Sequence, residues 1–436
     1  WRLVSTGNNL AQVHYGSDVD VASPGACSGF PLDTKGETVG KECIELSRWQ
    51  AESRGKTSLS ANGHTFTEKE ISYLRQHGWN LNSLPYVTLL RFANESIGGV
   101  SRPMMYIGSL FSSFCWHTED NWLYSINYIH TGAPKRWYGV SGPGAPKFEQ
   151  ALRAELPHLF EDEPQLLYSL STTLHPEILK RYGVDICTTL QHEGEFVVTF
   201  PRSYHSGFNC GFNVAESVNF ATSRWLDWGL MAANEYRFVR STVFPHEQFL
   251  WNLSLHAFDI RHLSVAKTLR DQINLYLKFS EAAMNRLQQR GITRHYQFTK
   301  MHLVLILDEE GHPVGVEEVK DAPNRITAET HINLKDNDGF EPEDPQCYVC
   351  GYDLFFHRVD CACRSPRLPR CLKHAEHPIC HCTNGQKFMS YRYRKSSFKA
   401  ILRTLDRVIF NLTPRQRHVS HSTQGSTSSV AMDVDE

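Results

Sequence analysis

Short runs of β-branched and aromatic residues, separated by turns rich in Gly, Pro and Asn, fill residues 84 to about 221. Runs at such close spacing are typical of an antiparallel β-sandwich or barrel, so we expect a β-rich core here. The clearest predicted strands are 125–130, 135–140, 195–200 and 214–220. Helical interruptions are expected at 153–159 and 176–181.

After Trp225 the hydrophobic positions recur with a helical period instead. One face of a 3.6-residue helix collects Leu269, Ile273, Leu277, Met284 and Leu287. Gly291 stands where such a helix would end. The pattern predicts a long helix that turns one apolar face towards a core.

The rest of the chain divides by composition. Residues 1–31 carry a short strand at 13–15, which we expect to be the first strand of the β-rich core. A polar stretch at 32–65 is typical of a surface insertion. Two apolar runs, 301–307 and 314–319, predict a β-hairpin. The expected order beyond residue 65 is a β-rich core at 66–224, a mostly helical domain with the hairpin at 225–340, a cysteine-rich module at 341–395, a C-terminal helix at 396–412 and a disordered tail at 413–436.

The chain has 436 residues, enough for two or three domains, and its 41% apolar and 21% charged residues exclude a chain that is disordered throughout. With 45 Lys and Arg against 47 Asp and Glu, the net charge of −2 indicates no bulk attraction to nucleic acid, so direct DNA binding is not expected. No apolar run approaches the roughly 18 residues of a membrane span. Because the chain starts at Trp1 without an initiator Met or an apolar leader, we expect it to lie inside a longer protein.

Seven of the twelve cysteines lie between Cys347 and Cys382, interleaved with histidines. The other five are scattered singly, which indicates a reducing compartment, and a dense Cys/His cluster there favours metal binding over disulfides. The closely spaced donor pairs are Cys347 and Cys350, Cys361 and Cys363, Cys371 and His374, and Cys380 and Cys382. Eight donors suffice for two tetrahedral zinc ions, which would supply most of the folding free energy of so small a module. The alternative is a set of unlinked reduced cysteines, and His377 and His381 are further donors.

A second candidate metal site begins at His117 and Glu119. On a strand, residues two apart point to the same face, so an imidazole and a carboxylate can converge on one ion. Two histidines and one carboxylate form the facial triad of non-haem Fe(II) oxygenases. His205 follows an apolar strand and opens a turn, which makes it the best candidate for the second histidine. A His-x-Glu pair alone is weak evidence, because an exposed His beside a solvated Glu is common.

The residues that follow favour the metal interpretation. Ser125 and Asn127 share one face of a predicted strand among aromatic residues, an unusual choice for a purely apolar core. Lys135, after a Gly-Ala-Pro turn, would offer a point charge to the distal carboxylate of a dicarboxylate co-substrate. The alternative for Lys135 is a solvated surface lysine.

The stretch from Phe111 to Val140 resembles the Jumonji C (JmjC) core of histone lysine demethylases, and among them the JARID subfamily. The segments 195–209 and 213–220 continue the resemblance, as do the zinc-ligand-like residues in their order of five Cys, one His and two Cys. The resemblance covers about residues 1–395, with the insertion at 32–65 as its main departure. It implies a mixed fold with a β-rich core: a double-stranded β-helix (jelly roll), then a helical segment and a small two-zinc module.

The resemblance also implies roles for individual residues. His117, Glu119 and His205 match the family's iron ligands and are the expected catalytic centre. The residues at 2-oxoglutarate or pocket-lining positions are Tyr15, Tyr106, Phe114, Ser125, Asn127, Lys135 and Asn219. In the family's zinc finger alternate pairs share an ion, which puts Cys347, Cys350, Cys371 and His374 on one zinc and Cys361, Cys363, Cys380 and Cys382 on the other. The implied cofactors are Fe(II), 2-oxoglutarate and O2 as co-substrates, and two Zn(II).

The implied activity is oxidative demethylation of a methylated lysine on a histone tail, most closely lysine 4 of histone H3 by subfamily analogy, with release of formaldehyde and succinate. The implied partners are the histone H3 tail and chromatin-associated complexes, and the implied location is the nucleus. Two other hypotheses stay open at this point: a protein hydroxylase of the same fold, and a catalytically silent chromatin scaffold. The intact triad and Lys135 argue against the scaffold.

Overall fold

The computed structural model describes residues 15–21, 60–61, 64–65, 77–93, 96–168, 173–297, 303–307, 313–318, 346–361, 368–377 and 381–413. The expected disordered tail therefore lies outside the described residues, apart from Thr413. Of the expected insertion, the structure describes only the short antiparallel pair β2 (Ser60–Ala61) and β3 (His64–Thr65). Of the expected strand at 13–15, only Tyr15 is described, and it directly precedes β1 (Gly16–Asp20).

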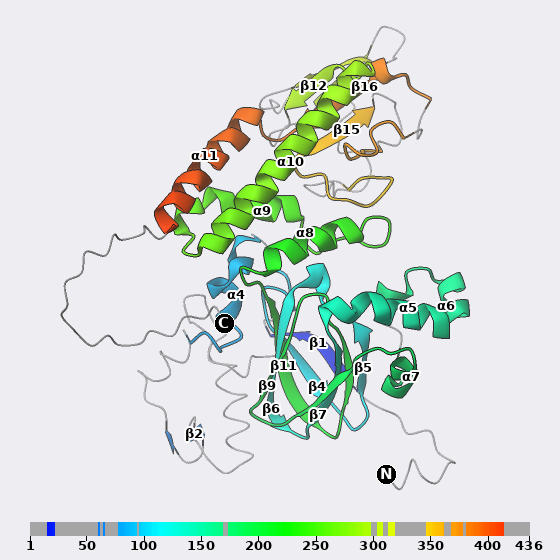
Figure 1. Cartoon of the computed structure of the whole chain (residues 1–436), viewed down its shortest axis with the longest axis vertical. Coiled ribbons are helices and arrows are strands. Elements are labelled where there is room, and N and C mark those ends of the chain that lie inside the picture. Colours follow the sequence, from blue (N-terminus) through cyan, green and yellow to red (C-terminus); the bar gives the residue numbers. More distant parts are fainter. Residues whose placement is uncertain are drawn as a thin grey trace, which may run out of the picture.

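Two antiparallel sheets form the β-rich core (Figure 1). The larger sheet has the order β1, β4 (Met104–Gly108), β11 (Asn213–Phe220), β6 (Tyr124–Gly132) and β9 (Phe196–Thr199). The smaller sheet has the order β5 (Ser113–His117), β10 (Tyr204–Asn209), β7 (Lys135–Val140) and β8 (Cys187–Gln191). From β4 to β11 the chain passes repeatedly from one sheet to the other. This topology is the jelly roll expected from the sequence, and β6, β7, β9 and β11 confirm the four predicted strands.

The two central strands of the larger sheet, β6 and β11, are mostly buried on both faces. On β6, Ile126 packs with Val218 of β11 beneath Leu81. Ser125 and Asn127 alternate with Ile126 and point to the opposite face, inside the jelly roll. Because the inward residues of this strand are polar, the interior of the jelly roll contains a cavity with polar walls and is not filled by apolar side chains.

Three helices and a 3-10 turn lie against the smaller sheet: α5 (Ala145–Glu155), α6 (Pro157–Asp162), η4 (Leu166–Tyr168) and α7 (Pro176–Arg181). Their core includes Phe148 and Leu152 packed with Trp116 and Tyr204. The predicted helix at 176–181 is confirmed. The helical segment predicted at 153–159 is confirmed as helical, but it spans the junction of two helices, α5 and α6. Leu156 lies outside helical geometry there (φ −123°, ψ 47°), as expected for a residue before proline.

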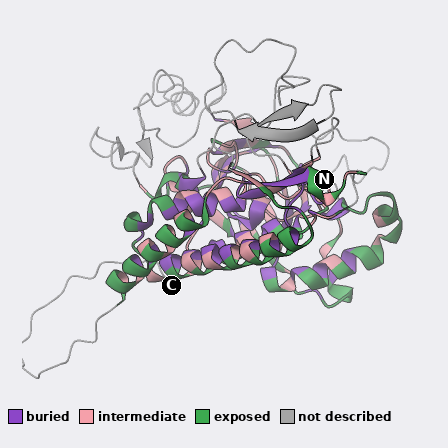
Figure 2. Ribbon diagram, turned by 90° about the horizontal axis from the view of Figure 1, so that it is seen from above, coloured by how far each residue is buried: buried purple, intermediate pink, exposed green. Residues whose placement is uncertain are grey.

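A helical layer covers one end of the jelly roll (Figure 1). Its members are α8 (Trp225–Glu235), α9 (His246–Leu255), α10 (Leu263–Gln289) and α11 (Lys395–Leu412), with α4 (Leu84–Val87), η1 (Leu89–Phe92) and η5 (Ala257–Asp259) beside them. Leu269, Ile273 and Leu277 of α10 belong to the largest core cluster that the described residues form. Buried residues follow one side of the long helices and exposed residues the other (Figure 2). The predicted amphipathic helix and its end before Gly291 (φ +90°) are confirmed.

A small sheet joins the end of the helical segment to the cysteine-rich segment. β12 (Arg294–Gln297) pairs in parallel with β16 (Lys387–Tyr391), which pairs antiparallel with β15 (His357–Cys361). The 3-10 turn η6 (Asn384–Gln386) precedes β16. The predicted hairpin is confirmed as β13 (Leu303–Leu307) and β14 (Pro313–Glu318). Of the described helices, none has the length and apolar character needed to cross a membrane.

Candidate active site and zinc site

Three residues that are far apart in the sequence converge inside the jelly roll. His117 ends β5 and His205 lies in β10, and the two are direct partners in the antiparallel pairing, with ring centroids 4.2 Å apart. Glu119 lies in extended backbone two residues beyond β5. The β5–β10 register shifts between His205 and Gly207, and a Cβ on Gly207 would lie 2.0 Å from the carbonyl oxygen of Arg136. Only glycine fits this close approach of strands beside the site.

The three side chains present their donor atoms to a common point. His205 Nε2 lies 3.2 Å from Glu119 Oε1, and His117 Nε2 lies 4.0 Å from the same oxygen. All three donor atoms lie within 4.8 Å of one another. Neighbouring ligands of an ion at about 2.1 Å lie about 3 Å apart in octahedral geometry, so small movements would complete a site.

Backbone carbonyls set the tautomer of both imidazoles. Nδ1 of His117 donates to the carbonyl oxygen of Cys115 at 2.8 Å, and Nδ1 of His205 to that of Ser203 at 3.1 Å. A carbonyl oxygen can only accept, so the proton sits on Nδ1 and the lone pair of Nε2 faces Glu119. This arrangement is the usual one for histidines that bind a metal.

The electrostatics keep the site ready for a cation. Burial, together with the neighbouring His205, lowers the pKa of His117 to about 4, so this imidazole is neutral at pH 7. Burial opposes ionisation of Glu119, but its contacts with His205, His117 and Asn219 outweigh the cost of burial, and the pKa of Glu119 falls to about 2. Asn219 donates to Glu119 Oε2 at 2.9 Å. Two imidazoles and one carboxylate fit a divalent metal ion, and iron is the metal that this ligand set holds with open positions in oxygenases.

The triad lines a cavity of about 450 Å³. All seven residues expected at co-substrate or pocket positions line it too: Tyr15, Tyr106, Phe114, Ser125, Asn127, Lys135 and Asn219. The structure thus brings every predicted site residue of the jelly roll to one cavity. Asn219 lies beside Glu119, where its amide orients the carboxylate.

Lys135 is buried at the far side of this cavity, with 2% of its side chain exposed. Its ammonium donates to Asn209 Oδ1 at 2.9 Å, and Phe114 presents its ring 5.5 Å from Nζ. Among the described residues, no carboxylate forms an ion pair with Lys135. Burial lowers the pKa of Lys135 to about 8. A buried ammonium without a counter-ion is a site for an anionic ligand.

Hydroxyl and amide groups line the wall between Lys135 and the triad. Ser125 Oγ and Thr199 Oγ1 lie 2.5 Å apart. Asn127 Oδ1 is buried without a partner among the described residues, and Gln191 bonds the main-chain oxygen of Asn127 at 3.1 Å. An unpartnered buried oxygen costs free energy unless a ligand or water satisfies it. The donor set therefore fits a small polar molecule that carries a carboxylate at the Lys135 end.

Two tyrosines and acidic residues form the mouth of the cavity. The rings of Tyr15 and Tyr106 lie 6.5 Å apart, and Tyr106 donates its hydroxyl to Asp18 Oδ1 at 3.2 Å. Burial raises the pKa of Tyr15 to about 12 and that of Tyr106 further, so both stay neutral. Asp120 lines the same cavity. Aromatic faces beside carboxylates suit a cationic side chain.

Sequence reasoning missed several residues of this site. Trp137 follows Lys135 by two positions on β7, lies 6.0 Å from the His205 ring and donates to Gln191 Oε1 at 2.8 Å. Because residues two apart on a strand point to the same face, its position relative to Lys135 could have predicted that it lines the same cavity. Asn209 is the cross-strand partner of Lys135, a relationship that appears only once the register is known. Asp120 and its ion-pair partner Arg240 also line the cavity.

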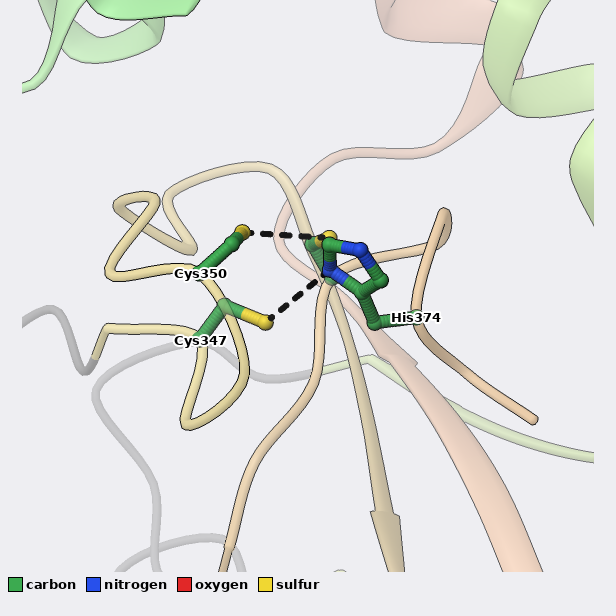
Figure 3. Close-up of side chains that lie close together, drawn as sticks. Cys347, Cys350 and His374 are labelled. Atoms are coloured by element: carbon green, nitrogen blue, oxygen red, sulfur yellow. Dashed lines mark hydrogen bonds between the residues drawn. The ribbon is translucent and has the colours of Figure 1, made fainter. Parts of the chain in front are cut away.

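A second cluster forms in the cysteine-rich segment, where Cys347, Cys350 and His374 converge (Figure 3). The fourth member is Cys371, whose Sγ lies 3.3 Å from His374 Nδ1 and 4.0 Å from Cys350 Sγ. Cys347 Sγ lies 3.8 Å from the same Nδ1. In a tetrahedral zinc site the donor atoms lie about 3.5–3.8 Å apart, so the cluster fits zinc.

Contacts within this cluster shift the pKa values of two of its thiols in opposite directions, down for Cys347 and up for Cys371. Hydrogen bonds from Cys350 and Cys371 hold the pKa of Cys347 well below its usual value. Of the second expected zinc site, the structure describes Cys361 and Cys382, whereas Cys363 and Cys380 lie outside the described residues.

Two family models match the chain. Residues 104–220 match the JmjC domain, described as a hydroxylase, and residues 347–401 match the C5HC2 zinc finger. The first range contains the triad and the second the Cys347 cluster.

Curated relatives match most of the chain. It is 35% identical over 396 residues to lysine-specific demethylase 5B of Gallus gallus, with 90% of the chain and 21% of that protein covered. It is 35% identical over 397 residues to lysine-specific demethylase JMJ703 of Oryza sativa subsp. japonica (90% and 28% covered). It is 32% identical over 443 residues to lysine-specific demethylase JMJ17 of Arabidopsis thaliana (100% and 31% covered). The chain thus spans less than a third of the length of these relatives. It is a JmjC-domain protein with a C5HC2 zinc finger, similar over most of its length to JARID-type lysine-specific demethylases.

Proposed function

We propose that this protein is an Fe(II)- and 2-oxoglutarate-dependent demethylase of methylated lysine on a histone tail. One observation carries the proposal: a two-histidine, one-carboxylate triad opens into the same cavity as a buried lysine that has no carboxylate partner among the described residues. The triad suits iron, and the lysine suits the distal carboxylate of a dicarboxylate. The names of the relatives support the reaction class.

His117, Glu119 and His205 would hold the iron, and Lys135 would hold 2-oxoglutarate. When bound, Fe(II) with 2-oxoglutarate and O2 supplies an oxidant strong enough to hydroxylate a C–H bond. In balance, one methyl-lysine, one O2 and one 2-oxoglutarate give the demethylated lysine, formaldehyde, succinate and CO2. Since a C–H bond is attacked, the nitrogen needs no lone pair.

The residues of the chain bind and orient the co-substrate, and they exclude water from the cavity. Lys135 pairs with the far carboxylate, while Ser125 and Asn127 offer polar contacts along the wall towards the triad. Phe114 and Trp137 pack edge to face at 4.8 Å and cover the space between. Such a wall keeps water from a reactive oxidant and fixes the orientation of the co-substrate.

The mouth of the cavity favours a cationic side chain. Tyr15 and Tyr106 offer ring faces, and Asp18 offers a carboxylate, so a methylated lysine would be attracted here. By analogy with the JARID subfamily, the preferred target is lysine 4 of histone H3. The same analogy supports a nuclear location and chromatin-associated partners.

Mass spectrometry tests this proposal. The protein is incubated with Fe(II), 2-oxoglutarate and peptides of the histone H3 tail that carry mono-, di- or trimethyl-lysine. Loss of the mass of one CH2 group, with formaldehyde in stoichiometric amount, is the expected result. Gain of one oxygen atom in a stable product would instead identify a protein hydroxylase. No peptide change and no iron bound would identify a silent scaffold.

A matched pair of variants ties the result to the site. His117→Ala is expected to lower turnover at least about 100-fold and to leave zinc content unchanged. His158→Ala, at a side chain that is 91% exposed, is the control and should keep full turnover. Full turnover in His117→Ala would overturn the assignment of the iron site.

A further inference from the structure

The segment 236–244, between α8 and α9, lies between the two candidate metal sites. We call it the connecting segment. Some of its residues contact the turn that carries Glu119, and others contact the residues around Cys350 and Cys371.

On one side the segment holds the residues that follow β5. Tyr236 directs its hydroxyl at the carbonyl oxygen of Glu119, 3.5 Å away. Arg240 forms an ion pair with Asp120, and its guanidinium lies 5.0 Å from the Tyr236 ring centroid. Asp120 and Arg240 both line the cavity. The segment therefore reaches the wall of the candidate active site.

The same turn has an unusual backbone that the segment supports. Asn121 and Trp122 have φ values of +49° and +48°, a left-handed conformation that asparagine tolerates but that is strained for the bulky Trp122. Asn121 is buried, accepts from the backbone N–H of Val243 at 3.1 Å and donates to the carbonyl oxygen of Phe244 at 3.1 Å. These bonds hold a strained turn only two residues from Glu119.

On its other side the segment contacts the zinc cluster. Arg237 Nη1 lies 3.4 Å from Cys350 Sγ and 3.6 Å from Cys371 Sγ, and its guanidinium lies 3.5 Å from the Tyr352 ring centroid. Three thiolates and a neutral histidine would leave a bound Zn²⁺ with a net charge of −1. The fixed positive charge of Arg237 offsets it.

Further contacts tie the segment to the main chain of the zinc cluster. Phe238 has a left-handed backbone (φ +69°), its N–H donates to the carbonyl oxygen of Cys350 at 2.9 Å, and its ring lies 5.4 Å from that of His374. Ser241 donates to Gln346 Oε1 at 3.0 Å, and Thr242 bonds Asp353. These partners flank Cys347 and Cys350 on both sides.

We propose that the connecting segment couples the Cys347–Cys350–Cys371–His374 site to the candidate iron site, with Arg237 as the positioning residue. A filled zinc site holds Arg237 and Phe238 in place. Their position sets Arg240 against Asp120 and keeps Val243 and Phe244 on Asn121. An empty zinc site releases the segment, and the strained turn beside Glu119 relaxes. The proposal deepens the proposed function, on which its catalytic consequence rests.

The test compares Arg237→Gln and Arg237→Lys with the control Arg403→Gln, which changes an exposed arginine on α11. All three are made in the full chain. The readouts are the rate of zinc transfer to a chromophoric chelator, amide hydrogen exchange in residues 118–122, and the affinity of the triad for Mn(II). None of these needs turnover.

Arg237→Gln is expected to speed zinc release about tenfold, to speed exchange in 118–122 several-fold, and to weaken Mn(II) binding. Arg237→Lys keeps the charge and should restore only part of each effect, because a lysine lacks the planar guanidinium that lies against the Tyr352 ring. The control Arg403→Gln should change none of the three readouts. Faster zinc release with unchanged exchange in 118–122 and unchanged Mn(II) affinity would overturn the coupling.

A second variant covers the case in which Arg237→Gln does not fold. Ser241→Ala combined with Thr242→Val removes two contacts to the zinc side and touches no metal ligand. Faster exchange in 118–122 is again expected, and unchanged exchange would count against the proposal. If exchange responds in either variant while no methylated peptide is ever turned over, the coupling stands and the proposed function fails. If turnover occurs, the coupling further predicts a higher KM for peptide in Arg237→Gln, with a smaller change in kcat.

Discussion

Asn219 donates a hydrogen bond to Glu119 at Oε2, the carboxylate oxygen that does not face His205. The same amide donates to the carbonyl oxygen of Tyr124 at 3.1 Å, which fixes its own orientation. Glu119 is thereby held with Oε1 towards both histidines. The geometry of the triad depends on this contact as well as on its three members.

Asn219→Ala should therefore weaken metal binding without removing a ligand. Loss of such an outer contact typically costs about 10–100-fold in metal affinity. Mn(II) or Co(II) affinity measured by calorimetry checks the prediction. Asn234→Ala, which removes an exposed amide on α8, is the control. Unchanged affinity in Asn219→Ala would show that Glu119 is held by other means.

Lys135→Met should have two opposite effects. It removes the charge expected to bind the distal carboxylate, so 2-oxoglutarate affinity should fall about 10–100-fold. It also removes a buried charge with no carboxylate partner among the described residues, so the ligand-free protein should become more stable by about 1–4 kcal/mol. Calorimetry and urea unfolding give the two values.

Pyruvate, which lacks the distal carboxylate, serves as the control ligand for Lys135→Met. Its affinity should change little between wild type and variant. A variant that binds 2-oxoglutarate as well as the wild type would place the carboxylate elsewhere in the cavity.

The affinity for 2-oxoglutarate should depend on pH above neutrality. The pKa of Lys135 is lowered to about 8 by burial, from an ordinary value of 10.5. The protonated lysine binds the carboxylate, so affinity should be flat below about pH 7 and fall as pH rises through 8. Titrations at several pH values check this, and Lys135→Met should show no such fall.

The contribution of Lys135 to the free energy of unfolding has the opposite pH dependence to the affinity for 2-oxoglutarate. Between pH 8 and 10.5 the unfolded chain holds a proton on Lys135 that the ligand-free folded chain has lost. Stability from this group should therefore rise with pH across that window. The difference between wild type and Lys135→Met should shrink as pH rises from 8 to 10.5.

A matched pair on α10 tests the helical core. Leu269 is fully buried in the largest core cluster, whereas Leu275 is 60% exposed on the same helix. Leu269→Ala should cost about 2–5 kcal/mol, and Leu275→Ala less than about 0.5 kcal/mol. Urea unfolding followed by circular dichroism gives both values. Equal costs would mean that α10 is packed differently.

Local patterns predicted much of the fold. Strand alternation placed Ser125 and Asn127 on one face of β6, and the 3.6-residue period placed Leu269 and Ile273 in the core, because both depend on spacing along a single element. The helical segment predicted at 153–159 belongs to two helices, because Pro157 starts a new helix in an otherwise continuous helical pattern. Proline keeps the residue before it out of helical backbone geometry, and the spacing of hydrophobic residues does not show this effect.

The candidate site was predictable only where its residues share an element or a known motif. His117, Glu119 and Lys135 lie in one stretch of sequence, so their grouping was visible. The partnership of Lys135 with Asn209 depends on the register of β7 against β10, which no local pattern encodes. The contacts of Arg237 and Asn121 arise from tertiary packing between segments more than 100 residues apart.

The parallel pairing of β12 with β16 has a consequence for how the molecule could be divided. These strands join residues 294–297 to residues 387–391, and α11 then returns to pack on α10. A nick in the polypeptide between β14 and Cys347 would leave the two pieces attached through this sheet and this helix pair. The two halves, produced as separate polypeptides, are accordingly expected to reassociate. One half could then be isotope-labelled for spectroscopy, so that only its residues give signals.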